Sequence, residues 1–222
     1  MRTFARATGL LSVVAALAIP TTAAQAASGP LGSPGDVITT PVQFALKALP
    51  VADEDRTGYQ RTSFKHWIDA DKDGCDTRAE VLKAEAFMTP EQGPKCKLTG
   101  GRWYSEYDDQ YIDGASGLDV DHRVPLAEAW DSGASSWTAA ERQAYANDRA
   151  LIAVSAKSNR GKADQDPSTW MPPAASDHCD YLRDWIVVKV HWQLAVDPAE
   201  HAALSKDLTN CPNAPVKVTL AR

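Results

Sequence analysis

The sequence predicts an α+β fold, largely helical and organised as a single domain that ends in a helical hairpin. An alternating run at residues 118–122 and an apolar run at 151–154 are typical of short strands, whereas apolar residues elsewhere recur every three or four positions, the helical period. The chain has 222 residues, of which 44% are hydrophobic and 23% charged. This composition and length are typical of a folded globular protein of one domain or two small ones.

The N-terminus has the pattern of a secretory signal peptide. Arg2 and Arg6 precede a short apolar run at residues 9–20, and Ala24-Gln25-Ala26 offers small residues for cleavage. The run is shorter than the roughly 20 apolar residues of a membrane anchor and contains a proline. We therefore expect a signal peptide over 1–26, cleavage after Ala26, and a secreted, extracellular protein whose mature form does not enter the membrane.

The N-terminal half predicts a lead-in followed by short elements. Residues 27–39, rich in Gly, Ser and Pro at their start, are expected to form a flexible lead-in to a domain over 40–222. Four elements are indicated by four local signals: a proline at a first helical position, helical spacing, a capping box, and alternation about a Thr-Gly-Gly turn. These are a helix from Thr40-Pro41 to Leu49, a short helix at 63–67, a helix from Thr77 with Glu80 in its capping box, and a hairpin over 96–107.

The C-terminal half predicts a strand, a long connection, a second strand and a helix, and then the helical hairpin. Capping boxes and N-cap residues mark the helix starts. The elements are a strand at 118–122, a helix from Thr138 with Glu141 in its capping box to about Asn147, a strand at 151–154, a helix capped by Ser155, and hairpin helices at 179–194 and 197–211.

Four cysteines, an even number, predict two disulfides in an exported protein. In the hairpin, the rise from Leu194 back to Cys179 and from Pro198 to Cys211 is about 20 Å each, which brings both cysteines to the same end. Cys179 is therefore expected to pair with Cys211. Cys75 and Cys96 remain as the second pair.

Several residues that could take part in catalysis lie on both sides of the second strand in the sequence. Asp121 and His122 end the first strand, Pro125 follows, and Asn159 and Lys162 lie on the helix. This pattern resembles the HNH (His-Me finger) endonuclease family, in particular the GmrSD-type nuclease domain of secreted actinobacterial proteins. The resemblance covers most of the mature chain, including residues 73–75, 101–108, 166–173 and the hairpin. It implies a small ββα-metal core at about 117–165 and endonuclease activity on DNA, RNA or both.

The resemblance and the chemistry of phosphodiester hydrolysis suggest a role for each residue. His122 is the candidate general base, because a neutral imidazole accepts a proton near neutral pH. Asp121 points to the opposite face of the strand and, with Asn159, is the candidate ligand of a divalent cation. One carboxylate and one amide favour Mg²⁺ or Mn²⁺. Lys162, on the same helical face as Asn159, is expected to contact a phosphate.

The net charge of −6 excludes nucleic acid binding through a global positive field. Lys157, Arg160 and Arg123 are instead expected to make the neighbourhood of the motif positive. Asp119 shares a strand face with Asp121, and it is either a second carboxylate of the site or a partner that orients Arg123.

One position departs from the family pattern. The family has an asparagine directly before the second strand, where it braces the loop that holds the histidine. Ala150 stands at that position here, and Asn147 is the candidate replacement.

A second metal pattern lies upstream. Asp69, Asp71, Asp73 and Glu80 fit the EF-hand loop pattern, with Gly74 at the sharp turn. The loop is either a structural Ca²⁺ site or a solvated acidic turn whose Glu80 belongs to the capping box.

Two further functional hypotheses remain beside the endonuclease. The first is an exported calcium-binding interaction module on a degenerate nuclease scaffold, which the loss of asparagine at Ala150 favours. The second is a cysteine hydrolase, which the even cysteine count disfavours. No obligate protein partner is evident from the sequence.

Overall fold

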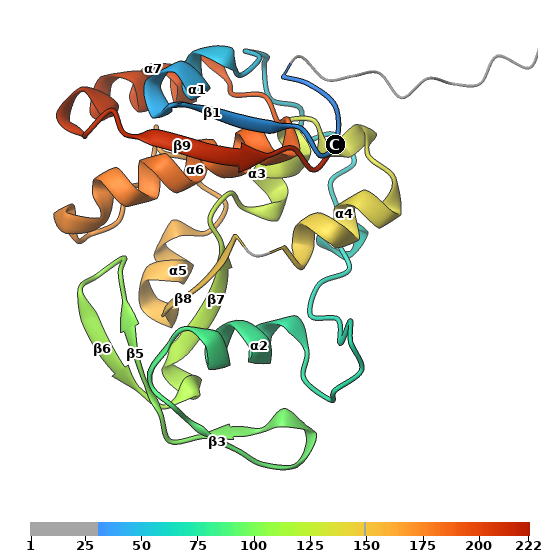
Figure 1. The fold of residues 1–222 in the computed structure, drawn as a ribbon, viewed down its shortest axis with the longest axis vertical. Helices are drawn as coiled ribbons and strands as arrows, with labels where there is room; N and C mark the ends of the chain where they lie inside the picture. The colour runs from blue at the N-terminus through green and yellow to red at the C-terminus, as the bar shows by residue number, and fades with distance from the viewer. Residues whose placement is uncertain (1–30, 149) are drawn as a thin grey trace, which may run out of the picture.

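The computed structural model describes residues 31–148 and 150–222 (Figure 1). The predicted signal peptide, 1–26, lies outside the described residues. The strands are β1 Val37–Pro41, β2 Ala86–Met88, β3 Glu91–Gln92, β4 Leu98–Thr99, β5 Arg102–Ser105, β6 Gln110–Asp113, β7 Leu118–His122, β8 Leu151–Ser155 and β9 Pro215–Thr219. The helices are α1 Val42–Ala48, α2 Thr77–Ala84, α3 Leu126–Asp131, α4 Ala139–Ala146, α5 Ala156–Lys162, α6 His178–Trp192 and α7 Pro198–Asp207. Of the helices in the described ranges, none has the length and apolar character needed to cross a bilayer.

The centre of the fold is a pair of antiparallel strands followed by a helix. β7 and β8 pair from Leu118 opposite Ser155 to His122 opposite Leu151. Every residue of β8 is buried, which explains its continuous apolar run. The Ser155 hydroxyl accepts a hydrogen bond from the Ser158 N–H and caps α5. The predicted strand, connection, strand and helix are confirmed, and α3 and α4 lie within the connection.

A second layer, formed by α2 and the three-stranded sheet β2-β5-β6, packs against β7 and β8 (Figure 1). Trp103 of β5 is fully buried, and its indole N–H donates to the carbonyl of Leu82 at 2.7 Å. This layer supports one face of β7 through a small apolar core of Leu82, Trp103, Leu118, Val120, Leu151 and Ala153.

The predicted hairpin over 96–107 is wrong. β4 pairs with β3, whereas β5 pairs with β2 and β6, so the Thr-Gly-Gly turn carries the chain from one sheet to another. Gly101 has a φ of +75°, and a Cβ atom there would lie 2.7 Å from the ring of Trp103. The glycine is therefore needed for the close approach of Trp103, and not for a two-strand turn.

Two other local predictions need correction. Asp76 caps α2, because its carboxylate accepts from the Ala79 N–H, so Thr77 and Glu80 do not form the predicted capping box. The short helix expected at 63–67 is a single 3-10 turn, η1, at Arg61–Ser63.

The C-terminal hairpin is confirmed. Asp197 and Glu200 form a capping box at the start of α7. The disulfide Cys179–Cys211 joins the two helices at one end, and Cys75–Cys96 is the second disulfide, as predicted. Both predicted pairs are therefore present.

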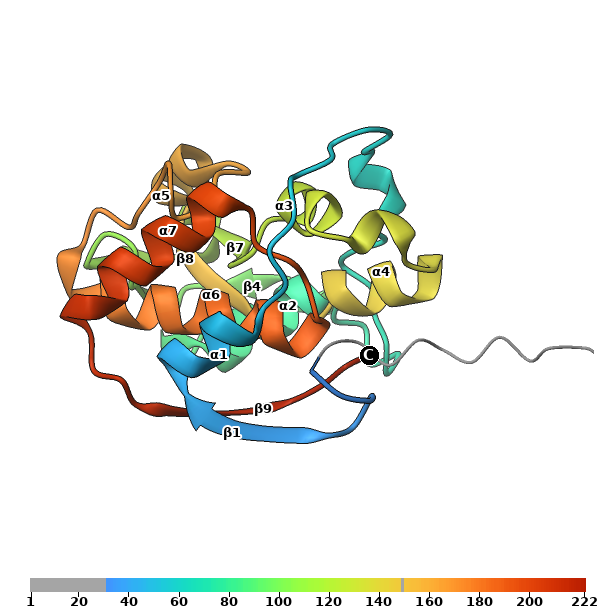
Figure 2. The same ribbon diagram turned by 90° about the horizontal axis from the view of Figure 1, so that it is seen from above.

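The two ends of the described chain form a sheet that the sequence did not predict. β1 pairs antiparallel with β9, and the two strands run beside α1 and α6 (Figure 2). The expectation of a flexible lead-in up to residue 39 is therefore wrong for 37–39. Val216 and Val218 of β9 are buried, and they provide the partner strand from the far end of the sequence.

We expect both disulfides to contribute strongly to stability. The paired cysteines are 21 and 32 residues apart in the sequence. Because each disulfide restricts the unfolded chain, it is expected to raise the free energy of unfolding by about 3–4 kcal/mol. Reduction should therefore lower the melting temperature clearly, as measured by circular dichroism with and without a reductant. A melting temperature that is unchanged after complete reduction, verified by thiol labelling, contradicts this prediction.

Candidate active site

Asp121 lies at the end of β7 in a buried network. Its Oδ2 atom accepts hydrogen bonds from the Tyr107 hydroxyl at 2.7 Å and from the Lys162 ammonium at 2.7 Å. Lys162 also donates to the main-chain carbonyl of His122 at 2.9 Å. Tyr107 and Lys162 are both 0% exposed and Asp121 is 6% exposed. The carboxylate is therefore held from two sides by fixed donors.

This burial corrects the role expected for Lys162. Its ammonium is fully buried and donates to Asp121 and to the carbonyl of His122, so it is not exposed to a phosphate in the cleft. Burial lowers the pKa of Lys162, and the ion pair with Asp121 opposes that shift. The lysine acts on the site through Asp121.

The ring of His122 packs against two aromatic side chains. It stacks on Tyr145 with an interplanar angle of 16° and contacts Trp67 at 5.8 Å between ring centroids. Its Nε2 atom lies 2.9 Å from the carbonyl of Ala146. A carbonyl only accepts, so Nε2 carries the proton and Nδ1 keeps its lone pair. Burial is the main cause that lowers the pKa of His122 to about 4, so the ring is neutral at pH 7.

The lowered pKa of His122 predicts a specific loss of stability in acid. The pKa falls from 6.5 to about 4 on folding, so its contribution is complete above pH 6.5 and is lost as the pH falls toward 4. From pH 7 to pH 5 this loss amounts to about 2 kcal/mol. The difference in unfolding free energy between the wild type and His122→Asn, measured by urea denaturation, should shrink by this amount. A difference that stays constant with pH contradicts the assignment.

Asn159 and Asp119 face each other between α5 and β7. The Asn159 amide nitrogen donates to Asp119 Oδ2 at 3.3 Å, and Arg160 forms an ion pair with the same oxygen at 3.3 Å. Asp119 therefore pairs with residues of α5. The alternative in which it orients Arg123 does not occur.

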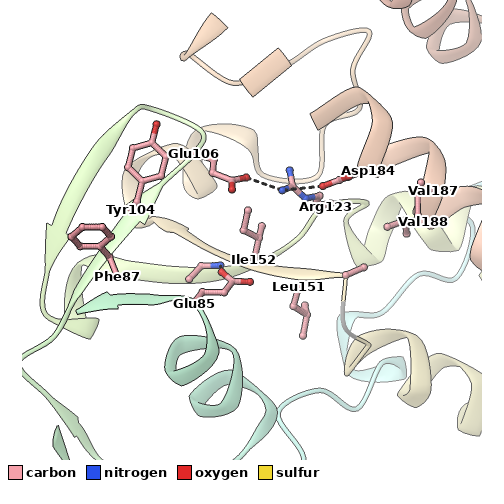
Figure 3. Close-up of a pocket in the computed structure, with 12 residues that line it drawn as sticks. Glu85, Phe87, Tyr104, Glu106, Arg123, Leu151, Ile152, Asp184, Val187 and Val188 are labelled. Carbon is pink, nitrogen blue, oxygen red and sulfur yellow. Dashed lines mark hydrogen bonds and ion pairs between the residues drawn. The ribbon is translucent and has the colours of Figure 1, made fainter. Parts of the chain in front are cut away.

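Arg123 is buried and lines a pocket together with residues of β8 (Figure 3). Its guanidinium forms ion pairs with Glu106 at 3.0 Å and Asp184 at 3.2 Å, and it is 8% exposed. It also lies over the ring of Tyr107. Arg123 therefore packs against the ring of Tyr107 and adds no exposed positive charge near Asp121. The expectation that Arg123 makes the neighbourhood of the motif positive is wrong.

One cleft of about 450 Å³ brings the central predicted residues together. Asp121, His122 and Asn159 all line it, whereas Lys162 does not. Tyr59 and Arg61, which come from a segment well before the motif in the sequence, line it as well. Sequence reasoning missed Tyr59, Arg61 and the Asp121 partner Tyr107, because only the folded chain places them beside the motif.

The donor atoms of the cleft fit a hard divalent cation. Both side-chain contacts of Asp121 use Oδ2, which leaves Oδ1 as a ligand, and Asn159 uses its nitrogen toward Asp119, which leaves its carbonyl oxygen. Oxygen donors of this kind suit Mg²⁺ or Mn²⁺ with water completing the shell. Within residues 31–148 and 150–222, the groups of three or more closely placed acidic, His or Cys residues lie elsewhere.

The acidic loop at residues 69–80 is one of those groups. Carboxylate oxygens of Asp69, Asp71 and Asp73 lie within 4.8 Å of one another on exposed side chains. Asp69 accepts from the Gly74 N–H, Asp71 from the Asp73 N–H and Asp73 from the Cys75 N–H, so all three also hold the turn. Glu80 approaches Asp73 and not all three aspartates. Three of the four predicted ligands therefore converge.

Asn147, the candidate replacement for the family asparagine, braces a different segment. Its side chain accepts from the Ile68 N–H and the Thr77 hydroxyl and donates to the carbonyl of Lys65. It thereby fixes the chain on both sides of the acidic loop. His122 is held by the neighbouring carbonyl of Ala146 and needs no asparagine at Ala150 for that contact.

The fold and the cleft define a class of protein. Two antiparallel strands and a helix carry an aspartate-histidine pair and an asparagine into one cleft, which is the arrangement implied by the resemblance to nucleases. Comparison with known families agrees. Residues 80–207 match the model of the family described as GmrSD restriction endonucleases, C-terminal domain, and the chain belongs to this family.

A curated relative extends the similarity beyond the matched domain. An uncharacterized secreted protein of Arthroderma benhamiae is 39% identical over 207 residues, which cover 91% of this chain and 97% of the relative. No solved structure matches the chain.

Proposed function

We propose that this protein is a secreted, metal-dependent endonuclease that hydrolyses phosphodiester bonds of nucleic acid. The observation that carries the proposal is the state of His122. Its ring is neutral at pH 7, its tautomer is fixed by Ala146, and it lines the same cleft as Asp121 and Asn159. Membership of a nuclease family supports the same conclusion.

Each residue has a distinct proposed role. His122 takes a proton from the attacking water as general base. Asp121 and Asn159 would hold Mg²⁺ or Mn²⁺, which when bound lowers the pKa of water and stabilises charge on the phosphate. Tyr107 and Lys162 hold the Asp121 carboxylate in place. Lys162 also neutralises Asp121, so the bound cation would share this carboxylate with an ammonium group.

A plasmid-nicking assay with and without EDTA tests the proposal. The same assay with single-stranded DNA, double-stranded DNA and RNA identifies the substrate. We expect cleavage of at least one of these, its loss in EDTA and its return with Mg²⁺ or Mn²⁺. Absence of cleavage of all three substrates in both cations contradicts the endonuclease.

Secretion is part of the proposal. It is supported by the signal-like residues 1–26, by the two disulfides and by the name of the relative, a secreted protein. Intact mass of the exported protein should correspond to residues 27–222 with no free thiol.

The convergence of Asp69, Asp71 and Asp73 favours a second candidate function, a calcium-binding interaction module. On this hypothesis, the loop binds Ca²⁺ with a dissociation constant no weaker than about 1 mM, the weak end for extracellular sites. Calorimetric titration measures it, with Asp71→Asn as the comparison variant. We expect loss of Ca²⁺ to loosen the N-terminal half and leave the nuclease chemistry in place. If no heat of binding is measured at millimolar Ca²⁺, the calcium hypothesis is wrong and the loop is an acidic turn.

A further inference from the structure

Part of the lining of the cleft comes from a segment outside the family match. The match begins at residue 80, whereas Tyr59 and Arg61, the second of which begins η1, line the cleft with His122 and Asn159. Residues that the family match does not cover therefore contribute to the candidate site.

Arg61 differs from the other charged residues of this cleft. Asp121 is paired with Lys162, Asp164 with Arg56 at 2.7 Å, and Arg160 with Asp119 at 3.3 Å. Arg61 is exposed, and among the described residues no carboxylate lies within ion-pair distance of it. Once the pairs are formed, the cleft presents one uncompensated positive charge beside a neutral histidine.

Arg61 shares the cleft with Tyr59, whose ring is held by other side chains. The ring of Tyr59 packs against Trp130 and Phe64, at 6.0 and 6.5 Å between centroids, and the guanidinium of Arg56 lies 5.5 Å from it. Because these contacts fix the ring, the Tyr59 hydroxyl has a defined place at the cleft, next to Arg61. Arg61 lines the same cleft as His122, the proposed general base.

We propose that Arg61 and the Tyr59 hydroxyl form a phosphate-binding subsite that holds the substrate phosphodiester beside His122. This inference rests on the proposed endonuclease function. A guanidinium presents several N–H donors in a planar fork that matches the two non-bridging oxygens of a phosphodiester, and the neighbouring hydroxyl can donate to one of these oxygens as well. The subsite supplies the phosphate contact that the buried Lys162 does not make.

The test measures binding separately from cleavage. Fluorescence anisotropy of a labelled oligonucleotide of the cleaved type, in EDTA, gives the dissociation constant at several salt concentrations. Arg61→Gln should raise it about 10-fold or more, as expected for loss of hydrogen bonds to a charged group, and should reduce the salt slope by about one. Arg61→Lys should recover part of the affinity. Tyr59→Phe, which removes only the hydroxyl, should have a smaller effect in the same direction.

Arg102→Gln is the matched control. Arg102 is a half-buried residue of β5, pairs with Asp113 and does not line the cleft, so its loss should leave affinity and salt slope unchanged. A wild type that cleaves, with Arg61→Gln indistinguishable from Arg102→Gln, overturns the subsite and leaves the endonuclease standing. A wild type that cleaves no nucleic acid overturns the endonuclease itself. Equal melting temperatures of the variants show that folding is not the cause of any difference.

Discussion

Replacing His122 with alanine should lower the rate of nucleic acid cleavage by about 10²–10⁴-fold, the usual contribution of a general base. The variant removes Nδ1, the ring atom left free to accept a proton by the contact of Nε2 with Ala146. Asp121 and Asn159 are unchanged, so affinity for the divalent cation should be retained. Single-turnover kinetics measure the first effect, and titration with Mn²⁺ measures the second.

Three further variants separate chemistry from folding. His122→Asn provides an amide donor for Ala146 but no proton acceptor, so it should lose activity as His122→Ala does. Asn159→Ala should weaken the binding of the divalent cation, and the activity of this variant should partly return at high Mg²⁺ because mass action offsets a raised dissociation constant. His201→Ala, on α7 and outside the cleft, should cleave normally. Near wild-type cleavage by folded His122→Ala would show that this mechanism is wrong.

Replacing Lys162 with methionine should destabilise the fold by about 3–5 kcal/mol, the cost of removing one partner from a buried ion pair. The methionine leaves the carboxylate of Asp121 and the carbonyl of His122 buried without their cation. Urea unfolding measures the loss. Cleavage by the variant should fall as well, because Asp121 loses one of the two donors that position it.

The control for this prediction is Lys157→Met, a lysine of the same helix that is exposed. Its effect on stability should be within about 0.5 kcal/mol of zero, as for ordinary surface changes. The double variant Asp121→Asn/Lys162→Met should recover part of the stability, since it removes both buried charges. If Lys162→Met is as stable as Lys157→Met but binds nucleic acid more weakly, Lys162 contacts phosphate and the buried pair is wrong.

Much of the fold could be predicted because its signals are local. The capping boxes at Thr138 and Asp197 involve residues three apart, and the burial of β8 is visible as an apolar run. The hairpin fixed the pairing of Cys179 with Cys211 for the same reason, since helix rise is constant. The prediction of a β-hairpin over 96–107 was wrong because the strands there pair with other segments, and no local sequence pattern encodes that choice of partner.

By itself, the sequence determined the strand–strand–helix motif, both disulfides and the residues Asp121, His122 and Asn159 that meet in one cleft. Only the tertiary structure decided that β1 joins β9, that Lys162 is buried against Asp121, and that Arg61 lines one cleft with His122. The physical reason is that burial and ion pairing depend on what packs against a residue. Helical spacing places Lys162 on the face of Asn159, but its ammonium is buried against Asp121 and the carbonyl of His122, which are about forty residues away in the sequence.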